Sequence, residues 1–313
     1  MSTPPAGPIV SFGSVNVDVT AYPDRLPAPG QTVHAARYAV GLGGKGANQA
    51  AAAARLGAHA ELAGRTGDDA FAATARTALA RLGVGTSCLA ADPAHPTGIA
   101  LIGVESSGEN AIIVAGGANA ALDATDAARA APILDRAAIL LLQLEIPVEA
   151  CLAAAERARA AGARVILDPA PAPATPLPPA LWRLVDVTTP NESETEALVG
   201  LRPHTPEDAH EAAGRLLALG AACAVVKLGA RGVAYRTATE SGFVPPFRVH
   251  PVDTVAAGDC FNAGLAVALA RGEPLASAVR FAAACGALAT TRPGAAEAAP
   301  TLDEVAPLLA AQQ

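Results

Sequence analysis

The sequence predicts an α/β fold, in which a mostly parallel central sheet is covered by helices on both faces and a small antiparallel sheet lies beside it. Short β-branched runs alternate with amphipathic, alanine-rich segments along most of the chain, as expected when helices connect parallel strands. The 313 residues are 51% hydrophobic, so the chain can bury a large core. We find no internal repeat and expect a single domain over residues 1–313.

The elements of the main sheet can be assigned in chain order from this alternation. Strands are expected at residues 9–12, 60–62, 139–143, 164–167, 185–188 and 224–227. Helices are expected at residues 46–56, 69–82, 148–161, 193–199, 206–219, 261–271 and 274–290. Strand and helix patterning resumes directly after the proline-rich stretch 169–179, so we interpret that stretch as a loop and not as a domain linker.

The small sheet is predicted from segments that alternate or pair without a helix between them. These segments are residues 15–20, 32–40, 98–104 and 110–114. Residues 105–109 make a suitable hairpin loop between the last two. We expect an antiparallel lid built from residues 13–20, 31–41, 97–104 and 109–115.

Composition excludes several classes of partner. The net charge is −7 and no cluster of Lys and Arg occurs, which argues against nucleic acid or an anionic membrane as the main partner. The longest apolar stretches, such as residues 137–142, are far too short to span a membrane. Residues 1–8 lack a basic start followed by an apolar run, so we expect a cytoplasmic protein.

Cysteine and histidine spacing gives no sign of a metal or disulfide framework. The five cysteines contain no C-x-x-C pair, which fits reduced thiols. No two of the six histidines are spaced four residues apart, so no histidine metal site is expected. Cys260 follows Asp259 at a helix start, but packing as a small hydrophobe is favoured over a reactive thiol.

Residues 253–259 have the chemistry of an anion cradle with a base attached. A helix start leaves N–H groups unpaired and carries the positive end of the helix dipole, so it favours a phosphate. Residues 256–258 are two alanines and a glycine, which let a phosphate approach the backbone. Asp259 would then face a hydroxyl beside that phosphate, which predicts phosphoryl transfer to an alcohol. The alternative is that Asp259 only caps the helix at residues 261–271.

The glycine run at residues 41–46 formally matches the G-x-G-x-x-G pattern of dinucleotide-binding folds. It does not follow the first strand, and Glu61 opens the next strand instead of closing it, so an NAD-dependent enzyme is a weak alternative. A P-loop fails because Lys45 is followed by Gly46 and not by Ser or Thr. The run is best interpreted as a glycine loop that carries Lys45 and Asn48 toward the hydroxyls of a small polar ligand.

A series of short strings then identifies a family. In chain order they are GSVNVD at 13–18, GGKGANQ at 43–49, TGDD at 66–69, GANA at 117–120, QLE at 143–145, DPAPA at 168–172, TPNE at 189–192, KLGARG at 227–232 and DTVAAGDCFN at 253–262. Through these strings the chain resembles the ribokinase family, also called the PfkB carbohydrate kinases, over nearly its whole length.

The resemblance implies a ribokinase-like three-layer α/β/α sandwich, with a β-lid that closes over the sugar and serves as a homodimer interface. It implies transfer of the γ-phosphate of ATP to the primary hydroxyl of a pentose, D-ribose, giving D-ribose 5-phosphate. Other acceptors in the same chemistry are deoxyribose, another pentose, a ketohexose or a nucleoside. A catalytically silent sugar-binding protein is the alternative outside enzyme function.

The same resemblance implies roles for individual residues. Catalysis would use Asp259 as general base and an anion hole at Ala256, Ala257 and Gly258. The sugar would contact Asn16, Asp18, Gly44, Lys45, Gly46, Asn48, Glu145 and Asp259. ATP would contact Asn191, Glu194, Lys227, Gly229, Arg231, Gly232, Gly258 and Ala283, with Asn191 and Glu194 also positioning Mg²⁺ through waters.

Members of this family can also bind a monovalent cation beside the anion hole. Matching positions are Asp253, Val255, Ala289, Arg292 and Gly294, which would offer mainly backbone carbonyls to K⁺. Ala298 stands where the family tends to have a serine hydroxyl. The resemblance therefore implies a K⁺ site in which one oxygen ligand is missing or replaced by water, and weakened activation by K⁺.

Overall fold

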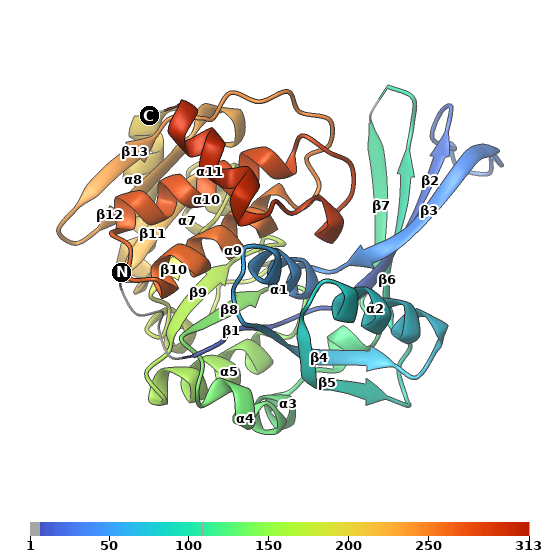
Figure 1. Ribbon diagram of the computed structural model, residues 1–313, viewed down its shortest axis with the longest axis horizontal. Coiled ribbons are helices and arrows are strands. Elements are labelled where there is room, and N and C mark those ends of the chain that lie inside the picture. Colours follow the sequence, from blue (N-terminus) through green and yellow to red (C-terminus); the bar gives the residue numbers. More distant parts are fainter. Residues whose placement is uncertain (1–6, 108, 313) are drawn as a thin grey trace.

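The computed structural model describes residues 7–107 and 109–312, which form a nine-stranded main sheet between two layers of helices (Figure 1). Its strands are β1 Ile9–Phe12, β4 Ala60–Gly67, β5 Gly85–Asp92, β8 Ile139–Gln143, β9 Arg164–Asp168, β10 Val187–Thr188, β11 Cys223–Lys227, β12 Val233–Thr237 and β13 Ser241–Val244. They lie in the order β13-β12-β11-β10-β9-β8-β1-β4-β5. All pairs from β11 to β5 are parallel, and β12 and β13 join antiparallel at one edge. The predicted sandwich with a mostly parallel sheet is confirmed.

The helices follow the strands along the chain. They are α1 Lys45–Arg55, α2 Ala70–Arg81, α3 Ala124–Arg129, α4 Ala131–Leu134, α5 Val148–Ala160, α6 Pro179–Trp182, α7 Glu192–Val199, α8 Pro206–Leu219, α9 Ala257–Ala270, α10 Leu275–Ala289 and α11 Leu302–Ala311. Short 3₁₀ turns are η1 Gly117–Ala121, η2 Gly229–Arg231 and η3 Ala296–Ala298. Within the described ranges, no helix has the length and apolar composition needed to cross a membrane.

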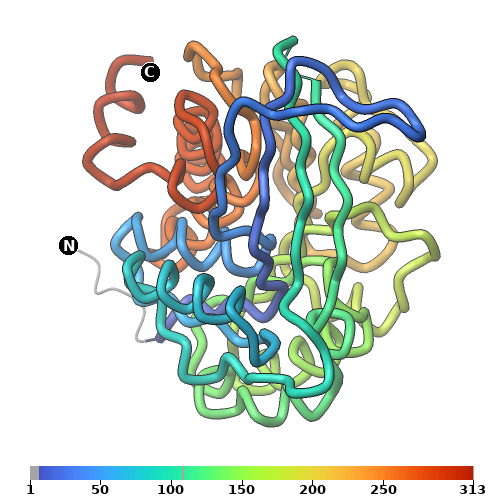
Figure 2. Tube along the Cα trace, turned by 90° about the vertical axis from the view of Figure 1, so that its right-hand side faces the viewer, coloured from blue at the N-terminus to red at the C-terminus, as the bar shows by residue number. Residues whose placement is uncertain are grey.

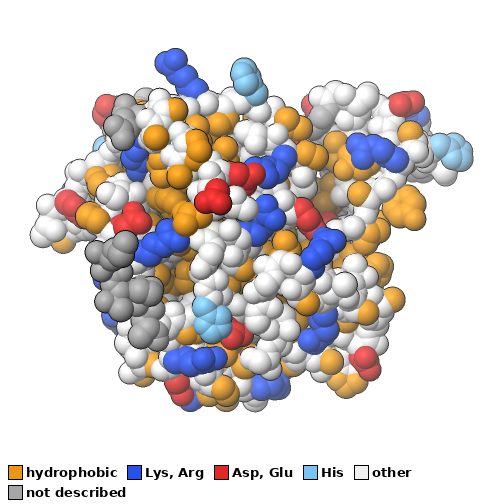
Figure 3. Space-filling model, viewed as in Figure 1, with side chains coloured by type: hydrophobic (Ala, Val, Ile, Leu, Met, Phe, Trp, Pro, Cys, Tyr) orange, Lys and Arg blue, Asp and Glu red, His pale blue; other side chains and the backbone are white. Residues whose placement is uncertain are grey.

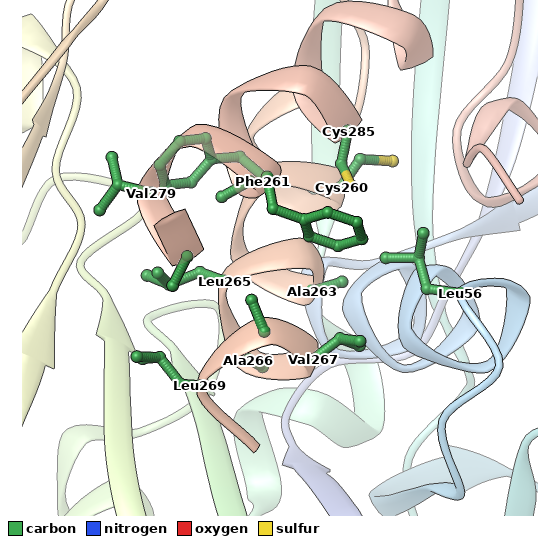
Figure 4. Packing of buried hydrophobic residues seen from close by; sticks show 14 of the residues in the cluster. Leu56, Cys260, Phe261, Ala263, Leu265, Ala266, Val267, Leu269, Val279 and Cys285 are labelled. Atoms are coloured by element: carbon green, nitrogen blue, oxygen red, sulfur yellow. The ribbon is translucent and has the colours of Figure 1, made fainter. Parts of the chain in front are cut away.

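Two hydrophobic clusters lie on opposite faces of the main sheet. Neighbouring residues of β8 alternate between them, since Ile139 packs with α1, α9 and α10 whereas Leu140 packs with α3, α5 and α8. On the first face, Phe261 and Leu265 of α9 lie in the cluster that includes Leu56, just after α1 (Figure 4). Burial of each large apolar side chain stabilises by about 1.5–3 kcal/mol, so this packing firmly anchors α9.

The small sheet projects from one side of the main body (Figures 1 and 2). Its strands are β2 Asn16–Pro23, β3 Ala35–Gly43, β6 Gly98–Val104 and β7 Asn110–Ala115, in the order β3-β2-β6-β7. Both hairpins are antiparallel as predicted, and a parallel pair, β2 with β6, joins them. A hydrogen bond of 2.9 Å from Glu105 N to Glu109 O closes the predicted hairpin loop, of which Gly108 lies outside the described residues.

Three boundaries differ from the sequence-based assignment in ways that affect the site. The prediction of a glycine loop over residues 41–46 is wrong in extent, because β3 continues to Gly43 and α1 starts at Lys45. Gly44 alone connects them, with a φ of 88° that favours glycine. The prediction that a helix starts at Phe261 is also wrong, since α9 begins four residues earlier at Ala257. The strand expected at 185–188 is limited to Val187–Thr188.

Several elements were not expected from the sequence at all. They are the edge strands β5 and β13, the strand β12 beside β13, the short helices α3, α4 and α6, and the C-terminal helix α11. The sequence of β5, GTSCLAAD, has no continuous apolar run, and of its residues Leu89 and Asp92 are buried, so the pattern did not indicate a strand.

The parallel strands all end at the same edge of the sheet, and this edge collects polar residues. Gly13 follows β1, Gln143 ends β8, Asp168 ends β9 and Lys227 ends β11. In open α/β sheets, ligands bind outside the carboxyl ends of the strands, where the order of connections reverses. Here β4 and β5 are added on one side of β1, whereas β8, β9, β10 and β11 are added in chain order on its other side. The candidate site is therefore expected beside β1 and β8.

Candidate active site

Helix α9 begins at a strained residue. Its N-cap is Ala256, the one non-glycine residue with positive φ in the described ranges, at φ 57° and ψ 9°. A left-handed conformation costs a non-glycine residue roughly 1–3 kcal/mol and is found where the surrounding structure fixes it, often at functional sites. The alternative that Asp259 merely caps the helix is wrong, because Asp259 is the third residue inside it. Ala257 N donates to Thr254 O at 3.3 Å, whereas the N–H groups of Ala256 and Gly258 have no acceptor among the described residues and can serve an anion.

Asp259 is buried and held by two side-chain amides. Its Oδ2 accepts from Asn48 Nδ2 and its Oδ1 from Gln49 Nε2, both at 3.0 Å, and 4% of the residue is exposed. Burial raises the pKa of Asp259, and the positive charge of Lys45 opposes that rise. Burial by itself would lower the pKa of Lys45, but Asp259 and the other carboxylates around it raise it instead. The site thus holds a buried carboxylate beside a firmly protonated lysine.

The residues predicted to contact the sugar converge on one side of Asp259. Glu145 Oε2 accepts from Ser14 Oγ at 2.5 Å and from Lys45 N at 3.0 Å, which ties the segment after β8 to the start of α1. Asn16 Oδ1 accepts from Asn119 Nδ2 at 2.8 Å, so the Asn16 amide is held in one orientation. These contacts bring the start of the small sheet and the start of α1 together.

Asp18 is the least satisfied polar group on this side. No hydrogen bond to its carboxylate occurs within the described ranges. Burial raises the pKa of Asp18 to about 7, and the nearby carboxylates of Glu145, Glu297 and Asp259 add to this rise. A Cβ added to Gly43 would lie 1.9 Å from Asp18 Oδ1, so glycine is required where the two strands approach. A partly buried acceptor without donors is available for ligand hydroxyls.

A cavity of about 730 Å³ lies on the other side of Asp259, within the usual size range of small-molecule sites. Lys45 and Asp259 line it at the sugar side. The predicted nucleotide contacts that line it are Asn191, Glu194, Lys227, Gly229, Gly232, Gly258 and Ala283, and the anion-hole residues Ala256 and Ala257 line it as well. Arg231 does not line it, since its guanidinium pairs with Glu192 at 2.9 Å. Most of residues 245–251, for which no role was expected from the sequence, also line the cavity.

Asn191 and Glu194 form a capping box at the start of α7. Glu194 Oε2 accepts from Asn191 N at 2.8 Å and Oε1 accepts from Asn191 Nδ2 at 2.9 Å. Burial raises the pKa of Glu194, opposed by Lys227. Residues 7–107 and 109–312 contain no group of three or more His, Cys, Asp or Glu side chains that could enclose a metal ion. The remaining lone pairs of Glu194 suit a water-mediated Mg²⁺, which keeps most of its waters in proteins.

The residues predicted to bind a monovalent cation lie around Asp253. Its Oδ1 accepts from Val255 N at 3.0 Å and its Oδ2 from Gly294 N at 3.1 Å, which holds two loops together. Ala289 is the last residue of α10. The side chain of Arg292 points to Glu304, at 3.0 Å, so only its backbone could serve a cation.

Three buried polar residues of the site were given no role from the sequence. Gln49 contacts Asp259, Gln143 contacts Gln49 at 2.7 Å, and Asp168 pairs with Lys227 at 3.2 Å. One feature of the sequence could have identified Gln143 and Asp168 as site residues. Gln143 and Asp168 each end a run of apolar strand residues, the position at which parallel strands present side chains to a ligand.

Comparison with known proteins gives consistent matches over nearly the whole chain. Residues 7–302 match the pfkB family carbohydrate kinases. The ribokinase of Haemophilus influenzae is 36% identical over 293 residues, covering 94% of this chain and 95% of the relative. The deoxyribokinase of Salmonella typhi is 33% identical over 296 residues, covering 95% and 96%. The structure of Arabidopsis thaliana ribokinase complexed with ribose and ATP superposes with a TM-score of 0.90 at 35% identity, covering 97% of this chain and 99% of the other.

Proposed function

Because the chain belongs to the pfkB family of carbohydrate kinases and is an ATP-dependent sugar kinase, we propose that it phosphorylates D-ribose on its primary hydroxyl. The observation that carries this proposal is the position of Asp259. Its carboxylate contacts Asn48 on the predicted sugar side and lines the cavity on the nucleotide side. A single base thus lies where a hydroxyl and a γ-phosphate would meet.

In the proposed mechanism, Asp259 accepts the proton of the primary hydroxyl as its oxygen attacks the γ-phosphate of ATP. The N–H groups of residues 256–258 and the ammonium of Lys227 stabilise the charge on the transferred group. Lys227 Nζ lies 3.5 Å from where a Cβ of Gly258 would be, which supports its place at the same phosphate. Mg²⁺, held through waters by Asn191 and Glu194, would neutralise phosphate charge. The burial that raises the pKa of Asp259 makes it a stronger base.

A panel of sugars and nucleosides with ATP tests the acceptor. ADP release is measured for D-ribose, deoxyribose, a ketohexose and a nucleoside, and the product is identified by NMR. We expect the highest kcat/KM with D-ribose and a 5-phosphate product. A higher kcat/KM with deoxyribose, the substrate named for one relative, would replace the assignment. Sugar binding without ADP release would support a catalytically silent sugar-binding protein.

We also propose that the small sheet is a lid over the sugar and pairs two copies of the chain. Hydrophobic side chains are visible on the surface of this sheet at the upper right of Figure 3. Tyr38 is 75% exposed and Ile113 is 68% exposed. Large exposed apolar patches mark association surfaces. Ile113→Asp is expected to convert a dimer to a monomer in sedimentation velocity, whereas Val252→Asp, equally exposed but outside the sheet, is not. A wild-type monomer at micromolar concentration would contradict the proposal.

A monovalent cation site around Asp253 is proposed with weakened affinity for K⁺. Ala298, which is fully buried, supplies no side-chain oxygen. Saturating turnover in buffer free of Na⁺ and K⁺ is therefore expected to change little when millimolar K⁺ is added. A many-fold increase in turnover on addition of K⁺ would mean that the backbone carbonyls are enough to bind K⁺, and the proposed weakening would be wrong. Ala298→Ser, which supplies a hydroxyl, is expected to increase the response to K⁺.

A further inference from the structure

A buried glutamine lies between two carboxylates at the centre of the site. Gln49, fully buried in α1, places its Nε2 3.0 Å from Asp259 Oδ1 and 3.0 Å from Asp168 Oδ2. Ionised carboxylates only accept hydrogen bonds, so the NH₂ group of Gln49 must face both. Its two hydrogens are then used, one on each carboxylate. No atom of this amide remains to contact a substrate.

A second buried glutamine fixes the first. Gln143 Nε2 donates to Gln49 Oε1 at 2.7 Å and lies 3.4 Å from Ser11 Oγ. Gln143 Oε1 packs against the backbone after β1, where a Cβ on Gly13 would lie 2.1 Å from it. Gln143 Oε1 has no hydrogen-bond partner in the described residues, so the orientation of the Gln143 amide follows from Gln49 Oε1, which can only accept a hydrogen bond. The donor chain runs in one direction, from Gln143 through Gln49 to the carboxylates.

The Gln49 amide lies in a cluster of charged side chains, so its hydrogen bonds affect how the carboxylates of that cluster interact. The charged groups that interact with Asp259 are Lys45 from α1, Asp18 from β2 and Asp168 from β9. Glu145 after β8, Glu194 from α7 and Lys227 from β11 interact in turn with these groups. Carboxylates outnumber ammonium groups there. In a buried site, two neighbouring carboxylates without donors between them tend to share a proton. The Gln49 amide supplies one donor to each.

We propose that Gln49 is a positioning residue of phosphoryl transfer, which holds the carboxylates of Asp168 and Asp259 on separate hydrogen bonds and aims Asp259 Oδ2 at the acceptor hydroxyl. Gln143 sets the orientation of the Gln49 amide. The proposal rests on the function assigned to Asp259 above. The new element is that Asp259 depends on hydrogen bonds that run from Gln143, at the end of β8 and beside the end of β1, through Gln49. The proposal also links Asp259 to Lys227, since Asp168 holds Lys227 with its other oxygen at 3.2 Å.

Gln49→Met tests this proposal in the full-length protein, because methionine keeps the unbranched shape and removes both donors. Losing a hydrogen bond to a charged group typically costs about 10- to 100-fold, so kcat is expected to fall by that factor. KM for sugar and for ATP should change less than about threefold, since Gln49 contacts neither. The acid limb of the kcat–pH profile should move to higher pH, because donors that favour the charged form of Asp259 are lost.

Gln143→Met and Asn262→Leu are the companion variants. Gln143→Met leaves the Gln49 amide without its orienting donor. We therefore expect a smaller decrease in kcat and a smaller shift of the acid limb than in Gln49→Met. Asn262 lies on α9 three residues after Asp259, buried and with no hydrogen-bond partner in the described residues, so Asn262→Leu controls for loss of a buried amide. Its pH profile should match that of the wild type.

The outcomes separate this proposal from the proposed function. Wild-type kcat and pH profile in Gln49→Met, with an inactive Asp259→Asn, would overturn the positioning role and leave the base assignment intact. Near-normal turnover in Asp259→Asn would overturn the base assignment first. If Gln49→Met does not fold, Gln143→Met decides. An unmoved acid limb in that variant counts against the proposal, and a shifted one supports it.

Discussion

Asp259→Asn is expected to lower kcat with D-ribose by about 10²- to 10⁴-fold, the contribution of a positioned general base. Asparagine is close in size to aspartate and avoids the cost of a buried charge, so the variant should fold. Its amide cannot accept the hydroxyl proton. KM for ATP should change little, because the nucleotide cavity and the first turn of α9 are kept.

Steady-state kinetics with ADP release measure this effect, and far-UV circular dichroism with thermal unfolding confirms that the variant is folded. Asp303→Asn is the matched control, since Asp303 lies in the first turn of α11 but is exposed and does not line the cavity. Its kcat should equal that of the wild type. If Asp259→Asn keeps kcat within about threefold, another group removes the proton.

The part of the site that the sequence predicts is the part built from neighbouring residues. Residues 256–259 are contiguous, and small residues before an aspartate at a helix start indicate an anion site without knowledge of the fold. The central strands were also predictable, because strands buried on both faces are continuous apolar runs. The left-handed Ala256 was not predictable, since no glycine marks it.

The unpredicted part of the site depends on contacts between distant residues. Gln49 meets Asp259 across 210 positions and Asp168 across 119. The sequence indicates that each side chain is polar, but not that one amide lies between two carboxylates. The cavity wall at residues 245–251 is irregular and proline-containing, so it carries no periodicity to detect.

Asp18→Asn is expected to stabilise the free protein at pH 8 while weakening its affinity for the sugar. Burial and three neighbouring carboxylates raise the pKa of Asp18 from 3.8 to about 7. Between these two values the folded protein holds a proton that the unfolded chain has released. Its stability therefore falls as pH rises through this interval and stays low above it. The neutral asparagine removes this pH-dependent loss, so the melting temperature should rise at pH 8 and change little at pH 4.

The same carboxylate is expected to serve the sugar hydroxyls. It has no donor among the described residues, so bound hydroxyls would supply the missing hydrogen bonds. Losing hydrogen bonds to a charged group lowers kcat/KM for D-ribose by about 10- to 150-fold, while KM for ATP stays constant. In the wild type, sugar affinity should rise as pH passes about 7 and Asp18 ionises. The variant should lack this step.

Thermal unfolding and sugar titrations at pH 4, 6 and 8 measure both effects. Asp208→Asn is the opposite control, because backbone N–H groups of His204 and Thr205 lower the pKa of Asp208, and its ionised form stabilises the fold. That variant should lose stability at pH 8 without any change in sugar affinity. A lower melting temperature for Asp18→Asn at pH 8 would mean that the wild-type carboxylate already has a stabilising partner. Its role as an acceptor kept free for the sugar would then be wrong.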